Sequence, residues 1–142
     1  SFMDSELGVK FPMKILVAED NDVNTLVIKM MLAKLGYKNC HFVCDGEEVL
    51  TKLRETEVDG TPNYCIILMD IQMPNLDGLE ATKLIKKKYG KSSPAILAVT
   101  ANAYREELDK CICAGMDDYI TKPLSAATLK SALYTIAQKI NK

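Results

Sequence analysis

The sequence lacks the features that mark several large classes of protein. Gly and Pro are scarce, at 7 and 5 of 142 residues, which excludes a collagen-like or low-complexity chain. Charge of one sign is missing too, because 18 basic and 19 acidic residues leave a net charge of -1. Direct contact with nucleic acid or an anionic membrane is therefore not favoured. No apolar run approaches the ~20 residues of a membrane span, and no signal peptide opens the chain. We expect a soluble, cytoplasmic monomer.

Cysteine and histidine show no catalytic or metal-binding pattern. The five cysteines are odd in number and have no C-x-x-C spacing; they are Cys40, Cys44, Cys65, Cys111 and Cys113. Since most lie in apolar runs, we expect free thiols, buried as small hydrophobes in a reducing compartment. The only histidine, His41, has no partner for catalysis or metal binding, so we interpret it as structural.

The length of 142 residues and the hydrophobic fraction of 48% suit one domain with a proper core. Residues 1–13 have no clear period, and we expect a linker or leader segment there, with residues 1–3 as its most leader-like part. The domain is expected to span residues 14–142, without an internal repeat.

Within that domain, short apolar runs alternate with longer segments of helical period. The runs, each an expected strand, are residues 14–18, 40–44, 65–69, 95–99 and 119–120. This alternation predicts an α/β fold with a parallel sheet. Run 40–44 contains His41 and is expected at an edge, whereas the first, third and fourth runs have no polar break and suit strands covered on both faces.

Several residues are typical of helix ends. Asp45 and Asp77 are each followed three residues later by Glu, as in a capping box, and Ser125 is a candidate cap for the last helix. Gly36 and Gly115 are expected just past helix C-termini.

The expected first helix, residues 23–35, is more apolar than one core-facing stripe requires. Such a stripe covers only ~100°, whereas apolar side chains here cover well over half of the circumference. Either neighbouring helices cover the surplus, or the Met-rich exposed part docks another protein. We favour docking, with Val23, Leu26, Val27 and Met30 as the candidate contacts.

A lysine cluster marks the expected third helix, at Lys83, Lys86, Lys87, Lys88 and Lys91. We interpret it as a solvated helix end favoured by the helix dipole, and recognition of an acidic partner is the alternative.

Five polar side chains stand at the C-terminal ends of apolar runs: Glu19, Asp20, Asp70, Thr100 and Lys122. Ligands of open parallel sheets bind at the carboxyl ends of the strands, so we expect the five to share one pocket. Three carboxylates repel one another unless a cation is present, and oxygen ligands without His or Cys suit Mg²⁺. Taken alone, Asp20 could instead cap the first helix, and Thr100 could be an ordinary strand-end hydroxyl.

Such a pocket has the parts for attack by a carboxylate on a phosphoryl group. A metal would neutralise developing charge, while Lys122 and Thr100 would hold phosphoryl oxygens. The chain has no P-loop or glycine-rich nucleotide loop, so ATP is not the expected donor. We expect the phosphoryl group to come from another protein.

Four ordered motifs give a specific resemblance. They are AEDN at residues 18–21, MDIQMPNLDG at 69–78, VTANA at 99–103 and GMDDYITKP at 115–123. Over about residues 14–140 the sequence resembles a receiver domain of the two-component response-regulator family, most like the receivers of hybrid histidine kinases. The resemblance implies a flavodoxin-like (βα)5 fold, doubly wound, with five parallel strands in the order 2-1-3-4-5.

By this resemblance Asp70 is the phosphoacceptor. Asp20 and Asp70 would coordinate Mg²⁺ directly, Glu19 would assist through water, and the backbone carbonyl of Gln72 would be a further ligand. Lys122 would bind the phosphoryl group.

The resemblance also implies a conformational switch. Thr100 and Tyr119 would form the switch pair and bias the fourth and fifth helices with their adjoining strand, although Tyr119 could be an ordinary core residue. The Lys122–Pro123 bond would be cis. The partner would be a histidine-containing phosphotransfer protein or a histidine kinase, which docks on the first helix, and a parent kinase can be membrane-bound.

Two alternatives remain. A phosphatase that uses an aspartate nucleophile needs a second acid two residues after Asp70, where this sequence has Gln72. A receiver-like interaction module would need no phosphate. We favour a signalling receiver over an enzyme, one that catalyses only its own phosphorylation and slow dephosphorylation.

Overall fold

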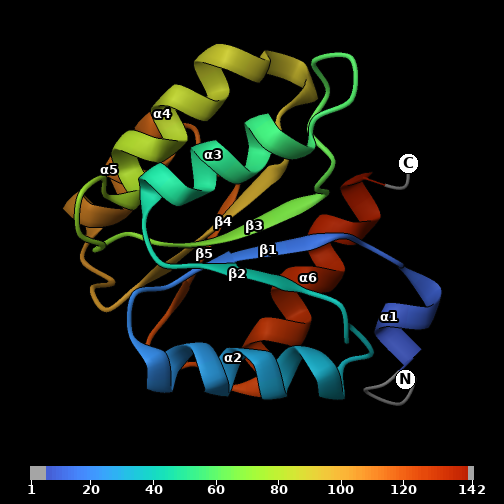
Figure 1. Cartoon of the computed structure of the whole chain (residues 1–142). Helices are drawn as coiled ribbons and strands as arrows, with labels where there is room; N and C mark the ends of the chain where they lie inside the picture. Colours follow the sequence, from blue (N-terminus) through green and yellow to red (C-terminus); the bar gives the residue numbers. More distant parts are fainter. Residues whose placement is uncertain (1–5, 141–142) are drawn as a thin grey trace.

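The chain alternates strands and helices around one parallel sheet, as Figure 1 shows for the computed structural model, which describes residues 6–140. The strands are β1 (Ile15–Ala18), β2 (His41–Val43), β3 (Ile66–Asp70), β4 (Ala95–Thr100) and β5 (Asp118–Thr121). They lie in the order β2-β1-β3-β4-β5 and all neighbours are parallel. The predicted fold class and strand order are confirmed.

Helices cover both faces of this sheet. They are α1 (Glu6–Lys10), α2 (Asp22–Lys34), α3 (Gly46–Thr56), α4 (Gly78–Tyr89), α5 (Arg105–Ala114) and α6 (Ala126–Ile140), and a short 3-10 turn at Gly90–Ser92 follows α4. In Figure 1, α3, α4 and α5 lie over one face, whereas α1, α2 and α6 lie over the other. Among the described residues no helix has the length and apolar character needed to cross a membrane.

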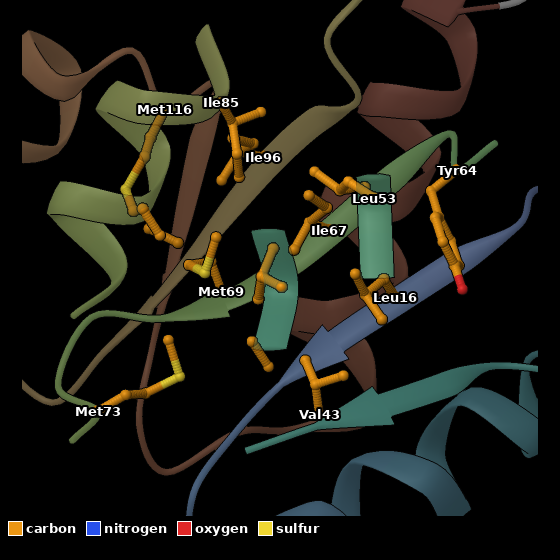
Figure 2. Close-up of a cluster of buried hydrophobic side chains, with 14 of the residues drawn as sticks. Leu16, Val43, Leu53, Tyr64, Ile67, Met69, Met73, Ile85, Ile96 and Met116 are labelled. Atoms are coloured by element: carbon orange, nitrogen blue, oxygen red, sulfur yellow. The ribbon is translucent and has the colours of Figure 1, made fainter. Parts of the chain in front are cut away.

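The strands contribute alternate side chains to two cores. On the α3 and α4 face, Leu16, Ile67 and Met69 pack with helix residues such as Leu53 and Ile85 (Figure 2). Their chain neighbours point to the α2 and α6 face. Because both faces are buried, β1 and β3 need no polar residue, whereas an edge strand can expose residues, as β2 does with His41. The edge position predicted for this strand is confirmed.

The helix caps follow the sequence pattern. Asp45 and Asp77 accept hydrogen bonds from the N–H groups three residues later, at 2.8 and 2.9 Å. Ser125 accepts one from the Thr128 N–H at 3.1 Å. Gly36 and Gly115 follow the ends of α2 and α5 with φ of 98° and 104°, a conformation that favours glycine.

The segment before β1 differs from expectation. Residues 6–10 form α1, a helix that the sequence pattern did not predict, and residues 1–5 lie outside the described part of the chain. Leu7 is fully buried. The Gly8 N–H donates to the Leu35 carbonyl at 2.8 Å, and a Cβ at Gly8 would lie 2.4 Å from the Gly36 oxygen. A helix this short shows no period in sequence, and glycine permits its close approach to the end of α2.

The cysteines are only partly as predicted. All five are free in the structure, but only Cys111 is buried, and Cys44 and Cys113 are exposed. Cys44 follows the edge strand β2, where side chains can face solvent. Its position in an apolar run was therefore not a reliable sign of burial. His41 hydrogen-bonds through Nδ1 to the Tyr64 hydroxyl at 2.5 Å, in agreement with a structural role.

We expect Leu7→Ala to lower the free energy of unfolding by about 3 kcal/mol, because it removes a fully buried side chain and leaves a cavity. Val9→Ala is the matched control, since Val9 in the same helix is 80% exposed. Urea denaturation of both variants measures the difference. Equal losses would show that α1 is not part of the cooperative fold.

Candidate functional site

The five polar strand-end residues come together at the carboxyl edge of the sheet. Glu19 and Asp20 follow β1, Asp70 and Thr100 end β3 and β4, and Lys122 follows β5. All five line one open cavity of about 740 Å³. Since β1 and β3 are paired, and β3 and β4 are paired, residues far apart in sequence meet here.

The three carboxylates form the centre of this cavity. Glu19, Asp20 and Asp70 each offer an oxygen, and these oxygens lie within 4.8 Å of one another. Glu19 and Asp70 are buried, at 3% and 5% exposure, whereas Asp20 is exposed. Three like charges at this spacing repel one another.

Lys122 partly offsets that repulsion. Its ammonium lies 3.1 Å from Asp70 Oδ2 and 3.2 Å from Glu19 Oε1. Burial would by itself lower the pKa of Lys122, but the hydrogen bond to Asp70 and the negative charges of Asp70 and Glu19 outweigh it and raise the pKa above its usual value. The ammonium therefore stays charged at neutral pH. With one cation for three acids, the formal charge of the cluster is -2.

The donor set fits a divalent cation. Glu19 Oε1 is buried and accepts no hydrogen bond of good geometry, although it is ion-paired with Lys122. A carboxylate oxygen without a hydrogen-bond donor is available to coordinate a metal ion, either directly or through a water molecule. Hard oxygen donors, net negative charge and an open side for water suit Mg²⁺.

Gln72 lies at the rim of the cavity, and its N–H donates to Asp70 Oδ1 at 3.2 Å. Asp70 is therefore fixed through both oxygens, by this N–H and by Lys122. The Lys122–Pro123 peptide bond is cis.

The two residues of the expected switch pair lie apart. Thr100 is buried, and its hydroxyl accepts from the Asn102 N–H at 3.0 Å and donates to the Asn102 carbonyl at 3.1 Å. Tyr119 is 42% exposed and lines a separate hollow between β5 and α6. The alternative of an ordinary core position for Tyr119 is therefore wrong.

Polar residues that the sequence analysis missed also line the cavity. Asn21 is the N-cap of α2 and accepts from the Asn24 N–H at 3.0 Å, so capping by Asp20 is wrong. Asn24 and Glu107 face the cavity as well. Asn24 lies one helical turn after Asp20, and this spacing could have indicated that Asn24 faces the cavity. Glu107 belongs to α5, and no local signal indicated where that helix would lie.

The surplus apolar residues of α2 are not covered by other helices. Within residues 6–140, Ile28 and Leu32 of this helix are buried in the core. The exposed residues, here called the α2 patch, are Val23, Leu26, Val27 and Met30, at 69%, 57%, 38% and 64%. The alternative of coverage by neighbouring helices is thus wrong for these four. The α2 patch starts three residues after Asp20, beside the cavity.

Comparison with known proteins agrees with this arrangement. Residues 15–134 match the family model of the response regulator receiver domain. The hybrid signal transduction histidine kinase H of Dictyostelium discoideum is 42% identical over 119 residues, which cover 82% of this chain and 8% of that kinase. The chain thus spans a small part of the length of this relative.

Two solved structures share the fold. The receiver domain of the sensor histidine kinase PA1611 from Pseudomonas aeruginosa has 38% identity and a TM-score of 0.73, over 89% of this chain and 98% of that one. Its structure has a magnesium ion coordinated in the active-site cleft. The receiver of the Saccharomyces cerevisiae response regulator Ssk1, crystallised with the histidine phosphotransfer protein Ypd1, has 25% identity and a TM-score of 0.76, over 89% of each chain.

We expect Asp20→Asn to raise the free energy of unfolding by about 1 kcal/mol in buffer without divalent cations. The change removes one of three repelling charges, and two unit charges 4 Å apart in water interact by about this amount. Thermal or urea unfolding in the presence of a chelator measures it. Asp22→Asn, at an exposed position in the first turn of α2, is the control and should give no gain. A destabilised Asp20→Asn would contradict the repulsion.

Proposed function

The chain belongs to the response regulator receiver domain family, and on that premise we propose that it accepts a phosphoryl group on Asp70 from a phosphohistidine of another protein. The observation that supports this most is the cluster of three carboxylates and one ammonium at the carboxyl edge of the sheet. Such a cluster stores electrostatic repulsion that a bound divalent cation can relieve.

In this proposal a carboxylate oxygen of Asp70 attacks phosphorus, the P–N bond to the donor histidine breaks, and the released imidazole takes a proton from water. Lys122, already 3.1 Å from Asp70 Oδ2, holds a phosphoryl oxygen and compensates its charge. Mg²⁺, when bound by Asp20, Asp70, the Gln72 carbonyl and through water by Glu19, supplies charge neutralisation at the transferring group. The N–H of Gln72 keeps Asp70 oriented for attack.

Phosphorylation would then operate the switch. It adds about -1.5 to -2 charges, which attract the Thr100 hydroxyl away from Asn102 and leave space for Tyr119 to turn inward. The exposed Tyr119 ring and the engaged Thr100 hydroxyl suit the state before phosphorylation. The output would be a population shift of α5, β5 and α6.

A phosphatase is less well supported. Hydrolysis of an aspartyl phosphate at enzymatic rates needs an acid two residues after the nucleophile, and the amide of Gln72 cannot exchange a proton in that role. The phosphoryl group is therefore expected to persist on Asp70. Rapid turnover of p-nitrophenyl phosphate would contradict this.

We expect acetyl phosphate with Mg²⁺ to add one phosphoryl group to the wild-type protein, as measured by intact-protein mass spectrometry. Asp70→Ala should remove the modification, and a chelator should prevent it. Asp22→Asn is the control and should be modified normally, since it keeps the cavity intact. A modification that persists unchanged in Asp70→Ala would refute Asp70 as the acceptor.

We further propose that the donor is a histidine-containing phosphotransfer protein, or the kinase domain of a parent hybrid kinase, and that it docks on the α2 patch. These residues are exposed, apolar and next to the cavity, so a partner seated on them would bring its histidine close to Asp70. Exposed apolar patches of this kind commonly mark interfaces.

Leu26→Asp is expected to slow phosphotransfer from such a protein at least about tenfold, while modification by acetyl phosphate stays normal. Ile112→Asp is the control, because Ile112 on α5 is a similarly exposed apolar residue, at 67%. Transfer of radiolabelled phosphate between the two proteins measures the rate. Equal effects of both changes would show that the α2 patch is not the docking site.

A further inference from the structure

A second surface with a defined chemistry lies away from the phosphoryl site. Helices α3 and α4 run side by side over the face of the sheet opposite α2 (Figure 1), and a groove of about 430 Å³ separates their outer surfaces. None of its lining residues belongs to the cavity around Asp70. It therefore needs an explanation of its own.

The walls of the groove are apolar. Leu50 of α3 and Leu84 and Ile85 of α4 line it. Ile85 is part of the core, but Leu84 is 45% exposed. A leucine beside a groove can bury further apolar surface only if another molecule covers it, at a gain of about 25 cal/mol per Å².

The rim of the groove is cationic. Arg54, Lys87 and Lys88 line it, and no acidic residue does. Lys88 has a partner in Glu57, at 3.6 Å. Arg54 and Lys87 have no carboxylate within ion-pairing distance in the described chain, and both are exposed. The whole protein has a net charge of -1, so this local excess of positive charge is not a general property of its surface.

Sequence spacing repeats on both helices. Arg54 follows Leu50 by four residues, and Lys87 and Lys88 follow Leu84 by three and four. Each leucine therefore has a cation one turn further along the same helix face. The helix dipole accounts for cations in the last turn of a helix. It does not account for the exposed leucine that precedes them in α4.

We propose that the groove between α3 and α4 binds an acidic, amphipathic segment of another protein. An apolar side chain of that segment packs between Leu50 and Leu84, and its carboxylates pair with Arg54 and Lys87. A small anion is not the expected ligand, because it would gain nothing from the apolar walls. A membrane is not expected either, because a surface that inserts into a membrane presents its apolar side chains outward, whereas this groove is concave. The opposite face holds the α2 patch, so this partner and the phosphoryl donor can bind at the same time.

The test uses a fluorescent synthetic peptide of about 15 residues, long enough for a helical turn pattern, with leucines on one face and glutamates on the other. Fluorescence anisotropy should show saturable binding to the wild-type domain that weakens as salt increases. A peptide with lysine in place of every glutamate, and one with serine in place of every leucine, should not bind. Amide chemical shifts in NMR spectra should change around Leu50 and Leu84.

The double variant Arg54→Glu/Lys87→Glu should weaken peptide binding at least about tenfold. Lys29→Glu/Lys34→Glu makes the same charge change at exposed positions of α2 and should have no such effect. Leu84→Ser tests the apolar wall without a change in charge and should also weaken binding. All three variants should be phosphorylated normally by acetyl phosphate, which separates this proposal from the role of Asp70.

Several results would overturn the proposal. They are the absence of saturable binding at millimolar peptide, equal binding of the lysine peptide, and equal losses in both double variants. Capture of the domain by phosphatidylglycerol vesicles or by an oligonucleotide, lost in Arg54→Glu/Lys87→Glu while the acidic peptide fails to bind, would assign the groove to another anionic partner. Concentration-dependent dimers that this double variant abolishes would assign it to a second copy of the chain.

Discussion

The organisation of this protein depends on an electrostatic conflict at one edge of its sheet. Glu19, Asp20 and Asp70 are held within a few ångströms of one another, and among the described residues Lys122 is the one cation paired with them. In a core designed for stability alone, such a cluster would be replaced. It persists because parallel strands whose carboxyl ends share an edge can hold it rigidly, with buried apolar residues beneath each acid. The excess negative charge of this cluster suits a divalent cation.

Much of this could be predicted from sequence because the relevant signals are local. The apolar runs specify strands, and the acids at their ends specify the site, since any parallel sheet places those ends together. The caps at Asp45 and Asp77 depend on a few adjacent residues. What escaped prediction depends on distant contacts. Helix α1 is defined by a single leucine and by a glycine that fits against Gly36. Glu107 enters the cavity only because of how α5 lies on β4 and β5.

Three separate regions of the molecular surface are candidate sites. The carboxyl edge of the sheet holds the chemical groups, the α2 patch lies beside it, and the α3 and α4 groove occupies the opposite face. The α2 patch and the α3 and α4 groove have one feature in common. In both, apolar side chains lie outside the stripe of the helix that faces the core. In α2 four exposed apolar residues form one patch, whereas in α4 a single exposed leucine, Leu84, stands among lysines. The two surfaces therefore suit partners of different chemistry.

The placement of α1 and of the end of α6 has a practical meaning for any larger assembly. Tyr37 donates its hydroxyl to the Phe11 carbonyl at 2.7 Å, and the Phe11 ring packs edge-on against Tyr134 of α6. These contacts hold α1 close to α6, and both α1 and the last turns of α6 lie toward the amino edge of the sheet, away from the carboxyl ends of the strands (Figure 1). The described segment therefore starts, at Glu6, and stops, at Ile140, on the side of the sheet opposite the carboxylate cluster, so a polypeptide that continues from either residue need not cross the cavity.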